Sequence, residues 1–275
     1  GYTSMFVNGG TITNQGFELM LRGVPVKTKD FDWSLSGTLS SNKNKVNELL
    51  GNRDEGYFRV VSAPFKVEVG ALVGDKYGVI MGTDYVYDEK GNKVVNADGT
   101  YAATDGNVAL GSVYQTALVG LSNTFRYKDL ELSVLFDAQF GGKYFSTSYM
   151  WGMYSGMLKE TTGNNELGNP IRNAVEDGGG VLLPGVNADG TPNTTRLDAQ
   201  SWAESIYSGP AAQSVFKSDY IKLREISIAY KVPLTSTKYI KSLRLSAYGR
   251  NLAMFGLDNK SFDPEMATTN SGNIQ

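Results

Sequence analysis

The stretch FDWSLSGTLS, residues 31–40, alternates strictly between two kinds of side chain. The odd-numbered positions are apolar or small, namely Phe31, Trp33, Leu35, Gly37 and Leu39. The even-numbered positions are all polar, an aspartate followed by serines and a threonine. Because successive side chains of a strand point to opposite faces, period 2 predicts a β-strand, whereas a helix would mix the two sets. The stretch therefore predicts a strand with one apolar and one polar face.

The same alternation recurs along the chain in pairs of segments. Upstream, residues 17–21 alternate in the same way and reach residue 31 through a short polar turn at 25–30, which predicts a hairpin. Further hairpins are predicted from residues 119–127 with 130–138, from 226–230 with 243–247, and more weakly from 57–69 with 76–87. About eight strands follow, so we expect an all-β, antiparallel fold.

The predicted connections alternate in length. Short turns are expected near residues 25–30, 70–74, 128–129 and 232–241, and long connections at 42–56, 88–112 and 141–215. Short periplasmic turns with long extracellular loops are typical of outer-membrane barrels, although a soluble sandwich can also gather its loops at one end. Five aromatic residues lie beside the short turns, as an interfacial girdle would: Phe31, Trp33, Tyr127, Tyr230 and Tyr239.

Composition excludes several classes of function. The 275 residues include no Cys and no His, which excludes disulfides, Cys/His zinc sites and Ser-His-Asp triads within the chain. A net charge of −2 gives no electrostatic basis for binding nucleic acid. No apolar run is long enough for a spanning helix, and a mean hydropathy of −0.26 is compatible with amphipathic membrane strands. Both ends are polar and unfinished, so we expect a piece of a longer protein.

Several motifs in a fixed order resemble the SusC/RagA family of TonB-dependent outer-membrane transporters. They are NQGFEL at 14–19, FDW at 31–33, NKNKV at 42–46, VEVG at 67–70, YG at 77–78, GLSNTFRYK at 120–128, GGK at 141–143, SDYIKLREIS at 218–227, GRNL at 249–252 and DPE at 263–265. The resemblance implies that residues 1–275 are a C-terminal part of a 22-stranded plugged barrel, with about eight of its last nine strands. The plug, the N-terminal extension with its TonB contact, and the final strand would lie outside these residues.

What the resemblance implies about function is non-enzymatic import across the outer membrane. A SusD-like surface lipoprotein would capture an oligosaccharide or a peptide, and TonB would open a path through the lumen. It implies no catalytic residue and no cofactor. Two alternatives stay open, a surface or secreted β-sandwich that binds glycans or mediates adhesion, and a stand-alone eight-stranded barrel. A lipid-exposed Trp33 favours a transporter, whereas a Trp33 buried between two sheets favours the sandwich.

The clearest metal-like pattern lies at residues 96–105. Asn96, Asp98 and Asp105 match positions 3, 5 and 12 of a calcium loop, but Val94 at position 1 cannot ligate and position 12 is Asp rather than Glu. The favoured interpretation is a tight Asp-Gly turn, repeated at residues 187–191. We therefore predict no metal site and retain the three residues only as weak candidates.

The long connection 141–215 is rich in aromatic residues whose rings suit sugar or peptide faces. The candidates for ligand contact are Tyr149, Trp151, Tyr154, Trp202 and Tyr207. The alternative is that they pack within the loop or against a partner protein. Among the charged residues, Arg224, Glu225 and Arg250 alternate with apolar positions, so we expect them to face the barrel interior and to pair with neighbours.

Overall fold

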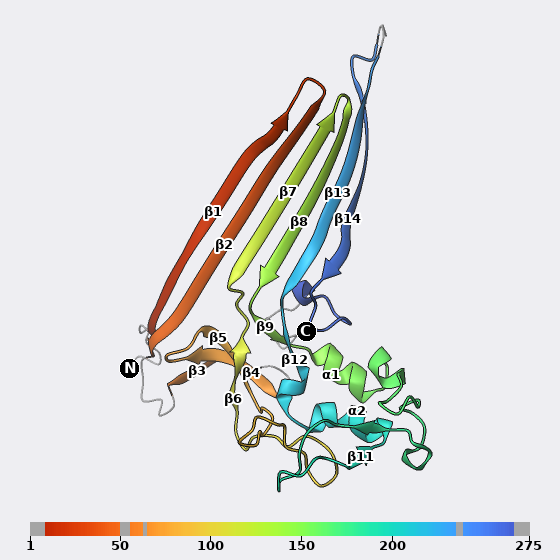
Figure 1. Ribbon diagram of the computed structural model, residues 1–275. Coiled ribbons are helices and arrows are strands. Elements are labelled where there is room, and N and C mark those ends of the chain that lie inside the picture. The colour runs from red at the N-terminus through yellow and green to blue at the C-terminus, as the bar shows by residue number, and fades with distance from the viewer. Residues whose placement is uncertain (1–8, 50–55, 63–64, 235–238, 267–275) are drawn as a thin grey trace.

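The computed structural model describes residues 9–49, 56–62, 65–234 and 239–266. Its main feature is a six-stranded antiparallel sheet in the order β1-β2-β7-β8-β13-β14, which we call the wall sheet (Figure 1). Its strands are β1 (Gly10–Lys27), β2 (Phe31–Leu49), β7 (Ala117–Tyr127), β8 (Leu130–Phe140), β13 (Tyr220–Val232) and β14 (Leu243–Phe255). Within the described residues the sheet is open, with β1 and β14 at its edges. The predicted all-β, antiparallel fold is confirmed, and a closed barrel is not formed by these residues alone.

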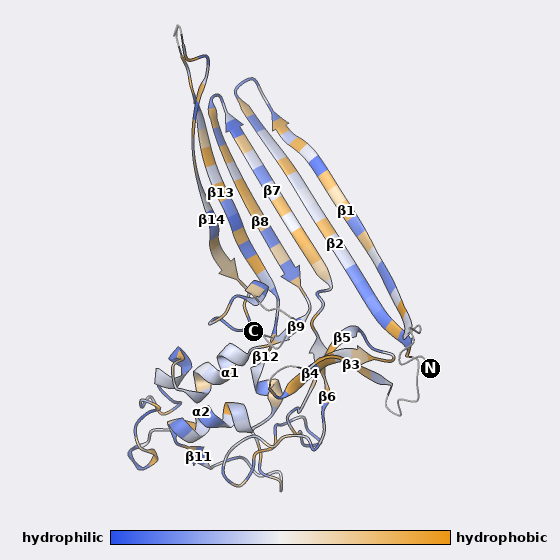
Figure 2. Ribbon diagram, turned by 180° about the vertical axis from the view of Figure 1, so that it is seen from behind, coloured by the Kyte–Doolittle hydropathy of each residue, from blue (hydrophilic) through white to orange (hydrophobic). Residues whose placement is uncertain are grey.

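The strand register places most of the apolar residues of the six strands on one face. One cross-strand row runs Leu19, Leu39, Val119, Ala138, Ile221 and Phe255. Another runs Val26, Trp33, Phe125, Leu132, Ile228 and Ala247. Directly paired residues of antiparallel strands share a face, so both rows belong to one surface, the apolar face. The alternation along the strands is visible in Figure 2.

No second sheet covers the apolar face in the part of the chain that the structure describes. Leu21 is 64% exposed, Leu245 is 58% exposed and Phe17 is 57% exposed. The other large exposed side chains of this face are Leu19, Val26, Leu121, Tyr127, Leu130, Phe140, Ile221, Ile228, Tyr230, Leu243 and Phe255. The polar residue Asn123 interrupts the face, and its side-chain oxygen accepts a hydrogen bond from Trp33 Nε1 at 3.3 Å. An apolar surface of this extent needs an apolar neighbour.

The predicted asymmetry of the connections is confirmed within the wall sheet, whereas the short turn predicted near 70–74 lies outside this sheet, and residues 235–238 of the turn predicted at 232–241 lie outside the described residues. The turns after β1 and β7 lie at one end of the wall sheet, and the long connections lie at the other (Figure 1). Lys128 takes the left-handed conformation with φ of 51°, which closes the tight turn between β7 and β8. Neighbouring turns are joined, because Lys128 N donates to Asp30 O at 2.7 Å and Lys231 N donates to Asp129 O at 2.9 Å.

The predicted hairpin at 57–87 is not part of the wall sheet. It forms a separate four-stranded sheet of β3 (Tyr57–Ser62), β4 (Val67–Leu72), β5 (Tyr77–Gly82) and β6 (Val108–Ser112). Each strand is at most six residues long, shorter than the roughly 9–11 residues that a membrane strand needs. Val67, Val69 and Ile80 are buried, so protein covers this sheet. The wall therefore has six strands in the described residues, rather than about eight.

The predicted loop 141–215 is a folded unit. It contains α1 (Thr147–Tyr154), α2 (Ala199–Ser208) and the 3₁₀-helices η1 (Lys159–Thr162), η2 (Val175–Asp177) and η3 (Ala211–Ser214). Its short strands pair as β9 (Lys143–Phe145) with β12 (Val215–Lys217) and β10 (Val181–Leu182) with β11 (Arg196–Leu197). Helix α1 begins after Ser146, whose hydroxyl accepts from Tyr149 N, and α2 begins after Asp198, which accepts from Gln200 N and Ser201 N.

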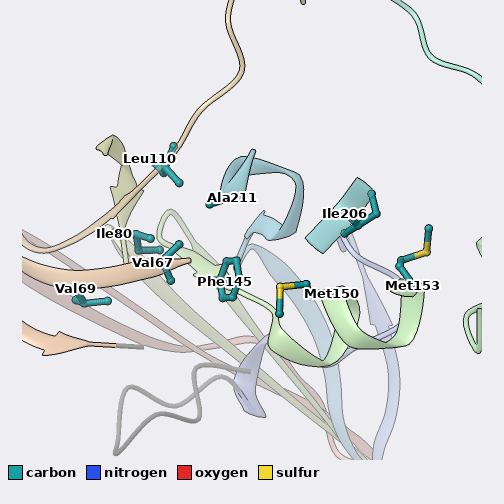
Figure 3. Packing of buried hydrophobic residues seen from close by; sticks show 9 residues of the cluster. All are labelled: Val67, Val69, Ile80, Leu110, Phe145, Met150, Met153, Ile206 and Ala211. Atoms are coloured by element: carbon teal, nitrogen blue, oxygen red, sulfur yellow. The ribbon is translucent and has the colours of Figure 1, made fainter. Parts of the chain in front are cut away.

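This unit and the four-stranded sheet share one hydrophobic core, and together we call them the loop module (Figure 3). The core joins β4, β5, β6, β9, α1, α2 and η3 through Val67, Val69, Ile80, Leu110, Phe145, Met150, Met153, Ile206 and Ala211. Phe145 is fully buried at its centre, between Val67 and Met150. A second, smaller cluster contains Val95, Tyr101, Leu183 and Leu197. No helix in the described ranges combines the length and apolar character needed to cross a membrane.

Strand β2 is longer than predicted and connects the two parts. Residues 42–49, which we expected to be loop, continue the strand beyond the end of β7. There the loop module forms hydrogen bonds with the edge of β2 that β7 leaves unpaired. Val46 N donates to Asp75 O and Gly74 N donates to Val46 O, each at 2.9 Å. Val46 is fully buried by this contact. The loop module is thus attached to the wall by backbone hydrogen bonds as well as by chain connections.

Candidate functional site

The polar face of the wall sheet, opposite the apolar face, carries a chain of ion pairs near the short turns. Arg126 Nη2 lies 2.9 Å from Glu131 Oε2, and Arg126 Nη1 lies 3.8 Å from Asp32 Oδ2. Arg244 Nη2 lies 2.9 Å from the other oxygen of Glu131. These residues link β2, β7, β8 and β14 across the sheet. Charges of both signs on one face of amphipathic strands are typical of a surface that faces water.

A second charged cluster lies at the loop end of the polar face, around Arg224. Arg224 and Lys222 are two positions apart and share the polar face, and a β-bulge between Leu223 and Glu225 brings Glu225 onto that face as well. Asn251 on β14 has a φ of 51°, and its side-chain oxygen accepts from Arg224 Nη1 at 3.3 Å. Arg224 Nε donates to Asp137 Oδ1 at 2.7 Å, and Arg224 Nη2 donates to Asp137 Oδ2 at 2.5 Å.

The segment after β14 returns to this cluster and adds its acidic side chains. It forms a 3₁₀-helix, η4 (Pro264–Met266), preceded by Asp263. Glu265 bonds to Arg224 and Lys222, and Asp263 Oδ2 lies 3.1 Å from Lys222 Nζ. The Arg224 guanidinium, together with the Lys222 and Tyr220 donors, lowers the pKa of Glu265 to about 2. Glu265 is therefore ionised throughout the physiological range.

The prediction that Arg224, Glu225 and Arg250 pair with neighbours is confirmed. Arg250 Nε donates to Glu225 Oε2 at 2.9 Å, and Arg224 pairs with Asp137 and Glu265. The two arginines differ in environment, because the Arg224 side chain is 29% exposed and that of Arg250 is 67% exposed.

This difference predicts unequal effects of the two arginine-to-alanine substitutions. We expect Arg224→Ala to lower the free energy of unfolding of the full-length protein by about 1–3 kcal/mol, because it leaves two carboxylates without their shared partner. Arg250→Ala removes one exposed ion pair and should cost at most about 1 kcal/mol. Urea unfolding in lipid vesicles measures both variants. Equal losses of unfolding free energy in the two variants would contradict the expectation that Arg224 stabilises the protein more than Arg250 does.

Three of the five predicted aromatic residues come together on the surface of the loop module. The Trp151 and Tyr207 rings stack with centroids 5.1 Å apart, and Tyr154 meets both edge to face at 5.5 and 5.8 Å. Each is partly exposed, at 36% for Trp151, 42% for Tyr154 and 38% for Tyr207. We call these three the aromatic cluster. Outside the cluster, Phe65 packs edge to face against Trp151, with ring centroids 5.2 Å apart.

The other two predicted aromatic residues belong to the interior. Tyr149 meets Phe216 edge to face at 4.8 Å, and both Tyr149 and Trp202 pack against the main hydrophobic core. Burial raises the pKa of Tyr149 to about 12. The structure thus separates the five candidates into a surface group of three and a packing group of two.

Sequence reasoning missed Lys66, which lies beside the aromatic cluster. Its ammonium donates to the backbone oxygens of Tyr207 and Gly209, where α2 ends, and lies 5.9 Å from the Tyr207 ring centroid. Burial lowers the pKa of Lys66 to about 8. A lysine at the C-terminus of a helix compensates the negative end of the helix dipole. No local pattern distinguishes it from a solvated lysine.

The weak calcium-loop candidates form turns. Asp98 Oδ1 accepts from Thr100 N at 2.9 Å and from Thr100 Oγ1 at 2.7 Å, while Gly99 has a φ of 88°. Asn96 Nδ2 donates to the same threonine hydroxyl at 3.1 Å, and Asp105 is exposed. The turn at 187–191 repeats these bonds. Among the residues that the structure describes, no three acidic side chains gather as metal ligands would.

Comparisons with known proteins show that the chain is similar to TonB-dependent receptors. The chain is 23% identical over 298 residues to TonB-dependent receptor P3 of Formosa agariphila, covering 99% of this chain and 27% of that protein. It is 30% identical over 144 residues to TonB-dependent receptor SusC of Bacteroides thetaiotaomicron, covering 47% of this chain and 14% of that protein. No protein-family model matches the chain.

Solved structures share the fold. The structure of the RagAB peptide transporter matches with a TM-score of 0.58 at 17% identity, over 96% of this chain and 28% of that one. The RagAB peptide importer in its 'open-open' state matches with a TM-score of 0.61 at 16% identity, over 94% and 27%. The chain spans about a quarter of the length of the relatives that it matches from end to end. By its relatives and its fold, the chain is similar to the SusC/RagA-like TonB-dependent transporters, and it matches about a quarter of the length of such a protein.

Proposed function

We propose that residues 1–275 form part of the barrel wall and outer loops of a TonB-dependent importer in the outer membrane. The observation that carries this proposal is the uncovered apolar face of six in-register strands, backed by a polar face with ion pairs. Strands β7 and β8 each contain 11 residues, which matches the roughly 9–11 residues of a tilted membrane strand. The apolar face would contact lipid, and the polar face would line the lumen.

The alternative of a β-sandwich module is less well supported. In a sandwich a second sheet would lie about 10 Å from the apolar face and bury it. The four-stranded sheet of the loop module instead lies beyond one end of the wall sheet (Figure 1). In a stand-alone eight-stranded barrel the wall would close on itself, whereas the described wall has six strands and two open edges.

The proposed importer works without catalysis. A SusD-like surface lipoprotein would capture an oligosaccharide or peptide and close over the extracellular loops, in a SusCD-type complex. TonB would act on a plug outside these residues and open the lumen. In this scheme, the wall sheet guides the substrate along its polar face, and the loop module forms part of the extracellular surface that meets the substrate or the lipoprotein.

Uptake by cells tests the import proposal. A strain that lacks the full-length protein should lose accumulation of labelled oligosaccharides or of labelled peptides, and the wild-type gene should restore it. A second strain without TonB should show the same loss. Unchanged accumulation of both substrate classes in both strains would contradict the proposal.

The aromatic cluster is the proposed contact surface for substrate on the loop module. Truncation of Trp151 to alanine should raise the half-saturating substrate concentration for uptake by roughly 2- to 10-fold, the equivalent of one aromatic contact. Met157→Ala is the matched control, because Met157 is 78% exposed and lies outside the cluster. If both variants import as the wild type does, the cluster has no part in substrate contact.

A further inference from the structure

Glu265 is bound by an unusually complete set of hydrogen-bond donors from the wall sheet. Arg224 Nη2 donates to its Oε1 at 2.5 Å, and Arg224 Nη1 donates to its Oε2 at 3.0 Å. Tyr220 OH donates to Oε1 at 2.9 Å, and Lys222 Nζ donates to Oε2. A two-pronged guanidinium, an ammonium and a phenol therefore converge on a single carboxylate, which is the arrangement that carboxylate recognition needs.

The donors also make contacts that do not involve the Glu265 side chain. Tyr220 and Lys222 are 5% and 4% exposed on β13. Asp137 accepts from Arg224 Nε and Nη2, and Asp263 accepts from Lys222 Nζ at 3.1 Å. Because these bonds fix the donors, removal of the Glu265 side chain would leave a preorganised site.

Glu265 itself is attached by a short segment at the surface. It lies within the single-turn helix η4, between Pro264, which is buried, and Met266, which is 64% exposed. The local bond that supports it runs from its own backbone N to Asp263 Oδ1 at 2.9 Å. The occupant of the donor set is therefore a surface segment, whereas the donors belong to the wall.

A hollow on the wall sheet gives access to the site from the polar face. It has a volume of about 560 Å³, and both Asp137 and Tyr220 line it. Gly120 and Thr38 also line it, and a side-chain carbon at Gly120 would lie 2.6 Å from Thr38 Oγ1. The glycine thus keeps space open next to the carboxylate-binding donors.

We propose that Tyr220, Lys222 and Arg224 form a carboxylate-binding site that Glu265 fills in this structure, and that a carboxylate of the transported ligand displaces Glu265. The inference rests on the proposed function, because it places the site on the lumen side. The exchange replaces one negative charge with another. The net charge around Arg224 and Lys222, which also pair with Asp137 and Asp263, therefore does not change. The carboxylate can come from a peptide C-terminus or from a uronic acid, which share this chemistry.

Displacement can be measured with a spin label at position 266. The full-length protein, with any other cysteines replaced, would carry Met266→Cys and be purified in detergent. The probes are acetyl-dialanine, its C-terminal amide, glucuronate and glucose, at matched ionic strength. A free carboxylate should mobilise the label at a concentration roughly tenfold lower than its neutral counterpart, since hydrogen bonds to charged groups are lost in the latter. A response to the dipeptide acid alone identifies the peptide source, and a response to glucuronate alone identifies the uronic acid.

Two variants test separately whether Glu265 occupies the site and whether Arg224 recognises the carboxylate. Glu265→Gln should mobilise the label without ligand and should bind the acid more tightly than the wild type does in calorimetric titration. Arg224→Gln should lose the preference for the acid over the amide. Equal responses to acid and amide, or none to either, in protein that migrates as a folded barrel would overturn the site but leave the import proposal intact. Protein that forms no barrel in detergent or lipid would instead contradict the proposed function.

Discussion

Leu121→Arg is expected to prevent most of the full-length protein from folding as a barrel in a lipid bilayer. Leu121 lies near the middle of β7 on the apolar face, between Gly37 and Phe136 in the cross-strand row. Arginine at the midplane of a membrane barrel costs about 2–4 kcal/mol, because its charge loses hydration without gaining a partner. The fraction of protein with heat-modifiable gel mobility, and urea unfolding in vesicles, measure this loss.

The neighbouring position provides the matched control. Ser122 lies on the polar face, paired with Ser36 and Leu135, so Ser122→Arg places the same side chain toward water. We expect this variant to fold with a stability close to that of the wild type, within about 1 kcal/mol. A control variant that folds as poorly as Leu121→Arg would mean that the two faces do not meet different solvents.

Phe145→Ala is expected to unfold the loop module while the wall sheet persists. Phe145 is fully buried where β4, β5 and α1 meet (Figure 3). Truncation of a buried phenylalanine removes its packing and leaves a cavity, at a cost of about 3–5 kcal/mol. Limited proteolysis should therefore cut the loop module of the variant rapidly, whereas its barrel mobility on gels remains.

Phe140→Ala is the control for this truncation. Phe140 ends β8 only a few residues earlier and is 41% exposed, so its removal leaves no enclosed cavity. We expect its proteolysis pattern to match that of the wild type. Joint loss of barrel and module in Phe145→Ala would show that the two parts fold as one cooperative unit, contrary to the expectation that the wall sheet persists without the core of the loop module.

The wall strands were predictable because their environment changes from one residue to the next. Residues 31–40 and 119–138 alternate because one face of their strands is apolar and the other is polar, so the period of 2 can be recognised in the sequence. The hairpin at 57–87 was placed wrongly for the same reason. Strands β4 and β5 are largely buried within the loop module, and apolar residues such as Val79 and Ile80 follow one another without alternation. Residues 42–49 are largely polar, so nothing local indicated that β2 continues there.

The candidate site was only partly predictable, because side-chain type does not specify burial. Trp151 and Trp202 are equivalent in the sequence, yet one is on the surface and the other packs against the core. The Glu265 site depends on contacts between residues more than 40 positions apart, as in Lys222 with Glu265. Motif resemblance pointed to both segments, but only the fold brings them together.

The pattern of thiol accessibility along β7 tests most directly whether the wall sheet is a membrane wall. Single cysteines at Leu121, Ser122, Thr124 and Phe125 would be introduced into the full-length protein, with any other cysteines replaced, in outer membranes. A water-soluble maleimide should modify positions 122 and 124 and spare 121 and 125 until the protein is denatured. Equal modification at all four positions, or the reverse pattern, would contradict the account.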